Sequence, residues 1–226
     1  MSKAPALELR LLLPILLVAM AAWAFIEIAG EVMAGNTRAI DQLILATLRD
    51  GAQPQALVGP IWLQEGMRDI TALGGPAVLA LTVGLAWGYL VLARQHAMSW
   101  LALGSALGGL LVASTLKQVF SQSRPDIAFH ATVASGYSFP SGHAMMSATV
   151  YLTLAALLAR LAPRTRLRLY LVAAAALLAG LVGVSRVYLG VHWASDVIAG
   201  WAAGAGWALL CWLVADRLHL GRGGKG

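Results

Sequence analysis

Long apolar runs without a charged side chain recur along this chain, several of them 17 residues or longer. A helix of about 20 apolar residues crosses the hydrocarbon core of a bilayer, whereas the surface of a water-soluble domain has no place for such runs. The composition agrees, with 59% hydrophobic and only 12% charged residues, as does the mean hydropathy of +0.75. The sequence therefore predicts a polytopic membrane protein and excludes disordered, collagen-like and disulfide-scaffold chains.

Six candidate spans follow from the distribution of charge, at about residues 11–29, 70–93, 97–116, 142–160, 168–187 and 193–215. They leave no soluble domain, so we expect residues 1–226 to form a single all-α membrane domain. The first run follows Lys3 and Arg10, as in a signal peptide. It extends about 18 residues, however, and lacks a small-x-small cleavage site, which predicts a retained first helix.

The basic residues predict the orientation, because Lys and Arg gather on the cytoplasmic side of a membrane. With the N-terminus in the cytoplasm, ten of the 16 basic residues lie on the inner side and six on the outer side. The cluster from Arg160 to Arg168, in one short loop, is the strongest single indicator. Both termini are therefore expected in the cytoplasm. The net charge of +6 is then a topological signal, and we expect no nucleic-acid partner.

The outer loop of residues 31–69 is long enough to need structure of its own. Ile40, Leu43, Ile44 and Leu48 recur at helical spacing with polar residues between them. This pattern predicts a short amphipathic helix at the outer interface. The role of the rest of the loop, and that of Glu27 in the first span, stays open.

The unusual polar residues fall at the outer ends of the last four spans. On the charge-derived topology, the third span ends outside and the fourth begins there, and the fifth and sixth repeat this arrangement. We therefore expect one membrane face to bring together Lys117, Arg124, Ser141, Gly142, His143, Arg186, His192 and Asp196.

These residue types suit an anion with more than one negative charge. Arg124 and Arg186 match phosphate oxygens with two donors each, and Lys117 adds a point charge. Ser141 and Gly142 begin a helix, where free backbone N–H groups and the helix dipole favour an anion. A single cation at a span end is more often a membrane anchor. The whole set on one face is much harder to explain in that way.

Two histidines complete the set. Asp196 follows His192 by four residues, a spacing that on a helix places the carboxylate on the same face. A carboxylate bonded to one ring nitrogen leaves the other as a nucleophile or base. By itself this pair is equally compatible with a helix cap.

Three motifs at these residues resemble a known family. Residues 117–125 read KQVFSQSRP, residues 140–143 read PSGH, and residues 185–196 read SRVYLGVHWASD. In this order and spacing they resemble the type-2 phosphatidic acid phosphatase superfamily, which includes the vanadium haloperoxidases. The resemblance implies a haloperoxidase-like helical bundle core, and within the motifs we see no departure from the family pattern.

The resemblance also implies roles. His192 would attack phosphorus and form a phosphohistidine, Asp196 would orient it, and His143 would protonate the departing oxygen and then activate water. Lys117, Arg124, Ser141, Gly142 and Arg186 would bind the phosphoryl oxygens. No metal or cofactor is expected, and the sequence shows no ligand cluster suited to one.

A site between apolar walls at a membrane face suggests a lipid phosphate as substrate. Similar bacterial proteins act on undecaprenyl pyrophosphate, phosphatidylglycerophosphate, phosphatidic acid or lipid A, so we expect a bacterial-type inner membrane with the site on its outer side. The motifs do not separate these substrates, nor hydrolysis from phosphotransfer between an undecaprenyl carrier and lipid A. A transporter using the cluster as an ion site is a third alternative, although transporters place such charges nearer mid-membrane. Oligomeric state cannot be read.

Overall fold

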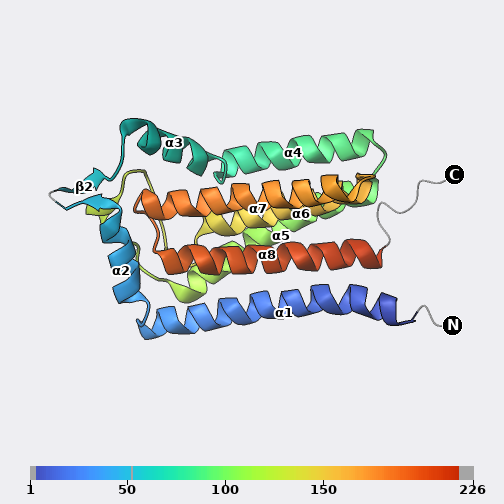
Figure 1. Cartoon of the computed structure of the whole chain (residues 1–226), viewed down its shortest axis with the longest axis horizontal. Coiled ribbons are helices and arrows are strands. Elements are labelled where there is room, and N and C mark those ends of the chain that lie inside the picture. Colours follow the sequence, from blue (N-terminus) through green and yellow to red (C-terminus); the bar gives the residue numbers. More distant parts are fainter. Residues whose placement is uncertain (1–3, 52, 219–226) are drawn as a thin grey trace.

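The computed structural model describes residues 4–51 and 53–218, which form a helical bundle with a small cap at one end (Figure 1). The elements follow in chain order as α1 (Ala4–Ala34), α2 (Arg38–Thr47), β1 (Arg49–Asp50), β2 (Gln53–Leu57), α3 (Ile61–Ala72), α4 (Pro76–Leu92), α5 (His96–Phe120), a 3-10 turn η1 (Ile127–Phe129), α6 (Gly142–Leu161), α7 (Thr165–Tyr188) and α8 (Ala194–Arg217). The predicted all-α membrane architecture is confirmed, with the short β1–β2 pair as an addition.

Within the described residues, five helical segments are long and apolar enough to cross a membrane, in α1, α5, α6, α7 and α8. The sixth candidate is the pair α3 and α4, which is bent by 52° at its break. The prediction of an unbroken second span over residues 70–93 is therefore wrong. Gly74, Gly75 and Pro76 explain the break, because the residue before a proline avoids the α conformation and Gly75 is extended, with φ −72° and ψ 150°. Tyr151 of α6 donates to the Leu73 carbonyl oxygen at 2.7 Å and so satisfies a group that the break exposes.

The segment between the first two candidate spans forms regular structure. α1 continues to Ala34, five residues beyond the predicted end at residue 29. The predicted amphipathic helix is present as α2 and lies across the end of the bundle (Figure 1). β1 and β2 pair antiparallel beyond it. The same end of the bundle therefore carries α2, the hairpin and the loops that contain the three motifs.

α6 lies at the centre of the bundle, packed against α5, α7 and α8. Small residues allow this close packing. A methyl group added at Gly204 of α8 would lie 2.3 Å from the Met145 carbonyl oxygen, and one at Gly109 of α5 would lie 2.7 Å from Thr149 Cγ2. These contacts fix the helix ends relative to one another, and the motif residues stand on those ends.

The contact between α7 and α8 leads to a prediction about the stability of the folded protein. A methyl group at Gly183 would lie 2.3 Å from Trp201 Cζ2, and the Trp201 ring is held by its Nε1–H bond to the Ala179 carbonyl oxygen at 2.9 Å. Gly183→Ala should therefore destabilise the protein by about 1 to 3 kcal/mol. Gly180→Ala is the matched control on the same helix, because nothing lies within 4 Å of that position. Thermal unfolding in detergent compares them, and equal melting temperatures would contradict this packing.

Candidate active site

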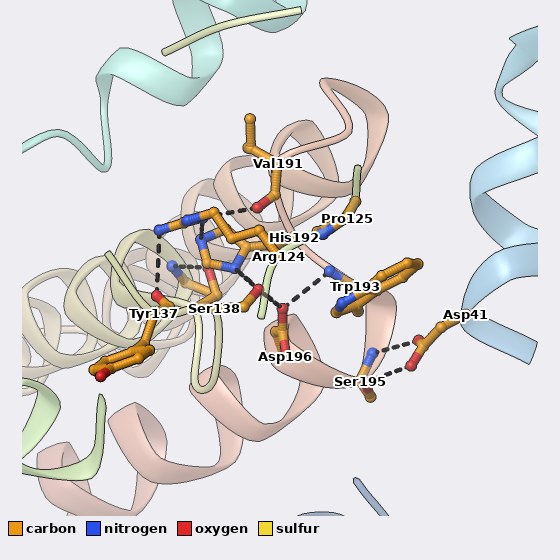
Figure 2. Close-up of polar contacts among 12 residues, drawn as sticks. Asp41, Arg124, Pro125, Tyr137, Ser138, Val191, His192, Trp193, Ser195 and Asp196 are labelled. Atoms are coloured by element: carbon orange, nitrogen blue, oxygen red, sulfur yellow. Dashed lines mark hydrogen bonds and ion pairs between the residues drawn. The ribbon is translucent and has the colours of Figure 1, made fainter. Parts of the chain in front are cut away.

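His192 stands in the short loop between α7 and α8, and Figure 2 shows the residues around it. Its side chain is only 2% exposed. Nδ1 lies 3.2 Å from Asp196 Oδ2. The expected contact therefore exists, but its geometry differs from the i, i+4 pair on a helix that we predicted. α8 begins at Ala194, and Asp196 turns back toward the preceding loop, where the same oxygen accepts the Trp193 N–H at 3.0 Å. Asp196 therefore caps its own helix and holds His192 at once.

The contact with Arg124 shows which nitrogen of the His192 ring carries the proton. Its Nη1 lies 3.0 Å from His192 Nε2. A guanidinium can only donate, so Nε2 is the acceptor and Nδ1 carries the proton. The Nδ1–H then donates to Asp196. Burial and the neighbouring Arg124 keep the pKa of His192 well below its usual value, so the ring is neutral with its lone pair on Nε2.

Ser138 joins this pair from the loop before α6. Its hydroxyl donates a short hydrogen bond to Asp196 Oδ2, and its oxygen lies 3.3 Å from His192 Nδ1. Both contacts are buried, and Figure 2 shows the three side chains together. Our sequence reasoning missed Ser138, because a serine two residues before Pro140 carries no spacing signal that points to Asp196, 58 residues later.

Arg124 also holds the loop that contains Ser138. Its Nε donates to the Gly136 carbonyl oxygen at 3.0 Å, and its Nη2 donates to the carbonyl oxygen of Ser135 at 2.9 Å. Nη1 donates to the Val191 carbonyl oxygen at 2.7 Å. The planar guanidinium thus joins the loop before α6 to the loop that carries His192, which a lysine has too few directed donors to do.

The other two cations come from helix ends. Lys117, in the last turn of α5, donates from Nζ to the Tyr137 carbonyl oxygen at 2.7 Å. Arg186, in the last turn of α7, donates from Nη1 to Thr71 Oγ1 at 2.9 Å. The Arg186 Nε is buried and has no hydrogen-bond partner within residues 4–51 and 53–218. A buried donor of this kind is costly unless a ligand accepts from it.

The start of α6 lies beside these cations. Ser141 is the N-cap, and its backbone N–H donates to the Asp196 carbonyl oxygen at 3.0 Å. Gly142 is close enough to Lys117 that an added methyl group would lie 3.4 Å from the lysine Cε. His143, one residue later, lines the same cavity as Lys117 and Gly142. The structure therefore brings together all eight predicted residues, at one end of the bundle.

An apolar cavity of about 540 Å³ begins at this cluster and runs between α4, α5 and α6. Lys117, Gly142 and His143 line one part of it, and the remainder is lined chiefly by apolar residues that include Leu79, Val83, Trp87, Leu107, Leu110 and Met146. A larger cavity of about 680 Å³ is lined by Pro14, Arg160, Trp212 and Asp216, among others, and by none of the eight site residues. The smaller cavity is thus the one next to the reactive groups.

The described residues contain no group of three or more His, Cys, Asp and Glu side chains placed to hold a metal ion. Glu27, which we left unassigned, is exposed on α1. His130 lies in the loop before α6 with its Nε2 3.1 Å from the Pro125 carbonyl oxygen. His96 is exposed at the start of α5.

Comparison with known proteins identifies the family to which the chain is similar. The sequence profile of the PAP2 superfamily matches residues 97–219. Phosphatidylglycerophosphatase B of Bacillus subtilis is 31% identical over 183 residues, which are 80% of this chain and 85% of that protein. Undecaprenyl-diphosphatase of Sulfolobus acidocaldarius is 38% identical over 101 residues, 42% of this chain and 45% of that protein.

A solved structure agrees with the sequence matches. The crystal structure of the transmembrane PAP2 type phosphatidylglycerolphosphate phosphatase from Bacillus subtilis superposes with a TM-score of 0.81 and 28% identity, over 89% of this chain and 96% of that one. The motifs, the helical bundle and these relatives lead to one conclusion: the chain belongs to the PAP2 superfamily and is a multi-pass membrane protein of its lipid phosphatase family.

Proposed function

We propose that this protein dephosphorylates a membrane lipid phosphate or pyrophosphate, without a metal ion, through a phosphohistidine at His192. The observation that carries the proposal is the state of the His192 ring. It is buried and neutral, its Nδ1–H is bonded to Asp196, and its Nε2 lone pair faces Arg124. A histidine so arranged is prepared for nucleophilic attack through Nε2.

The first step would transfer the phosphoryl group to the enzyme. Phosphoryl oxygens would accept from Lys117, Arg124 and Arg186, and the buried Arg186 Nε supplies one donor for them. Once Arg124 turns its donors to these oxygens, the Nε2 lone pair becomes free to attack phosphorus. The bond between phosphorus and the leaving oxygen breaks, and His143, which must enter this step protonated, gives that oxygen its proton. Stabilising the charge of the transition state is the main task of the three cations.

The second step would return His192 to its starting state. The phosphorylated ring is positively charged and still bonded through Nδ1–H to the Asp196 carboxylate. His143, now unprotonated, takes a proton from a water molecule as that water attacks phosphorus. The P–N bond breaks, its electrons return to Nε2, and inorganic phosphate leaves.

The apolar cavity supports a lipid as the substrate. It places hydrocarbon-lined space directly beside Lys117 and His143, so a phosphate at the cations can keep its chain among apolar side chains of α4, α5 and α6. The relatives are named for lipid phosphates and diphosphates of different chemistry, and for this chain we propose the same broad class.

Phosphate release tests the proposal. Detergent-purified protein should release inorganic phosphate from at least one of undecaprenyl pyrophosphate, phosphatidylglycerophosphate, phosphatidic acid and lipid A. The rate should be unchanged by EDTA, because Lys117, Arg124 and Arg186 supply the positive charge that a metal ion would otherwise provide. A strict requirement for added Mg²⁺ would contradict the mechanism. If folded protein releases no phosphate from any of these lipids, hydrolysis is the wrong reaction, and the same panel should be repeated with an acceptor lipid.

We also propose that the site faces the outer side of a bacterial-type inner membrane. α1 begins and α8 ends at the end of the bundle opposite α2 (Figure 1). Arg164 lies in the short connection between α6 and α7, and Arg166 lies in the first turn of α7. Basic loops stay in the cytoplasm. A reporter fused to the C-terminus should therefore behave as cytoplasmic, and an externally accessible tag there would reverse this orientation.

A further inference from the structure

Helix α2 contacts the start of α8, directly after the loop that carries His192, although 154 residues separate Asp41 from Ser195 in sequence. The decisive contact is made by Asp41, whose side chain is buried although it lies on an otherwise largely exposed helix. Its Oδ1 accepts the Ser195 backbone N–H at 3.0 Å, and its Oδ2 accepts the Ser195 hydroxyl at 2.7 Å (Figure 2).

The start of α8 needs this contact for a chemical reason. The first N–H groups of a helix have no partner within the helix, and the N-cap side chain normally accepts one of them. Here the N-cap residue is Trp193, whose indole can only donate. It donates to the Ser123 carbonyl oxygen at 3.2 Å. The Ser195 N–H is therefore satisfied by a carboxylate from another element, and the negative charge of Asp41 is also favourable at a helix N-terminus.

Two arginines of the same outer segment support the loop on either side. The Arg38 guanidinium lies over the Trp193 ring, 4.7 Å from its centroid. Arg49 is buried, and its Nη1 donates to the Tyr188 carbonyl oxygen at 2.9 Å. The segment from Tyr188 at the end of α7 to Ser195 at the start of α8 is thus held at both ends by residues 38–49, with His192 between the two attachment points.

We propose that Asp41 is a positioning residue for His192, acting through Ser195 and the first turn of α8. Ser195 immediately precedes Asp196, whose carboxylate orients the His192 ring. A shift of this turn moves Oδ2 of Asp196 away from Nδ1 and tilts Nε2 from its line of attack. A displacement of about 1 Å at a reacting group can cost on the order of 100-fold in rate. The inference rests on the proposed role of His192 as nucleophile.

The predicted signature is a loss of kcat with little change in KM. None of the polar contacts of Asp41 involves Lys117, Arg124 or Arg186, so phosphate binding should persist when Asp41 is changed. Asp41→Ala should lower kcat by roughly 10- to 100-fold. Asp41→Asn should be intermediate, because its amide oxygen still accepts the Ser195 N–H while its NH₂ group can donate to the Ser195 hydroxyl.

The experiment is a double-mutant cycle measured as lipid phosphate hydrolysis in detergent. It uses Asp41→Asn, Ser195→Ala and their combination, with Asp41→Ala as the more disruptive variant and circular dichroism as the check on folding. Gln42→Ala is the control, because Gln42 is exposed on the same helix. We expect the two single changes to lower kcat and the double variant to lose little more than the worse single variant. KM should stay close to that of the unmodified protein in all three.

Three outcomes would overturn the inference: an unchanged kcat in folded Asp41→Asn and Asp41→Ala, a loss found only in KM, or fully additive losses in the double variant. His192→Gln assayed in parallel separates this inference from its premise. If His192→Gln remains active, His192 is not the nucleophile, and both the proposed function and the positioning role fail. If His192→Gln is inactive while the Asp41 variants retain normal kcat, only the positioning role is wrong.

Discussion

His192→Gln should lower phosphate release from a lipid phosphate by at least about 10⁴-fold, because it removes the nitrogen that accepts the phosphoryl group. Glutamine roughly keeps the volume of the buried side chain, and its NH₂ group can still donate to Asp196 Oδ2. Folding should therefore be retained. The measurement is inorganic phosphate release at saturating lipid, beside a thermal unfolding curve for each protein.

His96→Gln is the matched control for this change, since it makes the same substitution at an exposed histidine at the start of α5. It should keep the full rate. Release by folded His192→Gln within about tenfold of the unmodified rate, a difference of only some 1.4 kcal/mol in activation free energy, would remove His192 as the nucleophile.

Arg124→Lys should lower kcat/KM by roughly 10²- to 10³-fold even though it keeps the positive charge. Losing one donor to a transition-state oxygen costs about this much, and the lysine also loses the fork that joins Gly136 and Ser135 to Val191. The assay is the dependence of rate on lipid concentration. Arg166→Lys, at an exposed position in the first turn of α7, is the control and should match the unmodified protein.

The expected loss of kcat/KM in Arg124→Lys comes from the changed geometry of the donors, since the positive charge is kept. Thermal unfolding of Arg124→Lys should be measured alongside, because the same contacts also order the loop before α6. A folded Arg124→Lys with kcat/KM within threefold of the unmodified protein, which is under 1 kcal/mol, would show that only the charge of Arg124 matters.

The grouping of the site residues at one end of the bundle was predictable because it depends only on where the spans and the charged residues lie along the sequence. Charge counting placed Lys117, Arg186 and Asp196 at span ends of the same side, and helices that cross a membrane must bring such ends to one face. The distances between these side chains were not predictable in this way. They depend on how closely the helices approach, as at Gly204 against Met145, and span counting carries no information about that.

The residues that we missed share a physical property: each acts through a partner distant in sequence. Thr71 accepts from Arg186, 115 residues away, Ser138 donates to Asp196, and Asp41 accepts from Ser195. No periodicity or spacing marks such a residue in a single sequence. In the sequence, Asp41 has the pattern of a polar residue on the solvent-exposed face of an amphipathic helix. Its side chain is buried, however, and contacts Ser195 at the start of α8.

The backbone preferences of glycine and proline explain why the predicted span over residues 70–93 is broken. Hydropathy predicted one span over residues 70–93 because every side chain there is uncharged. The Gly74-Gly75-Pro76 sequence overrides this, since the backbone at Gly75 is extended and the helix restarts at Pro76. The break also brings Gly74 next to His143, where an added methyl group would lie 3.3 Å from the His143 carbonyl oxygen.

Direct trapping of the phosphoenzyme tests the central claim. The protein would be mixed with a lipid diphosphate labelled with ³²P at its terminal phosphate, quenched in alkali, where phosphohistidine persists, and digested for peptide mapping. His143→Gln should increase the trapped fraction, because a phosphate leaving group needs little protonation in the first step while the second step loses its base. We predict label on the peptide that contains His192, and none in His192→Gln. Label on another residue, or steady phosphate release without any labelled His192 peptide in either protein, would contradict the phosphohistidine mechanism.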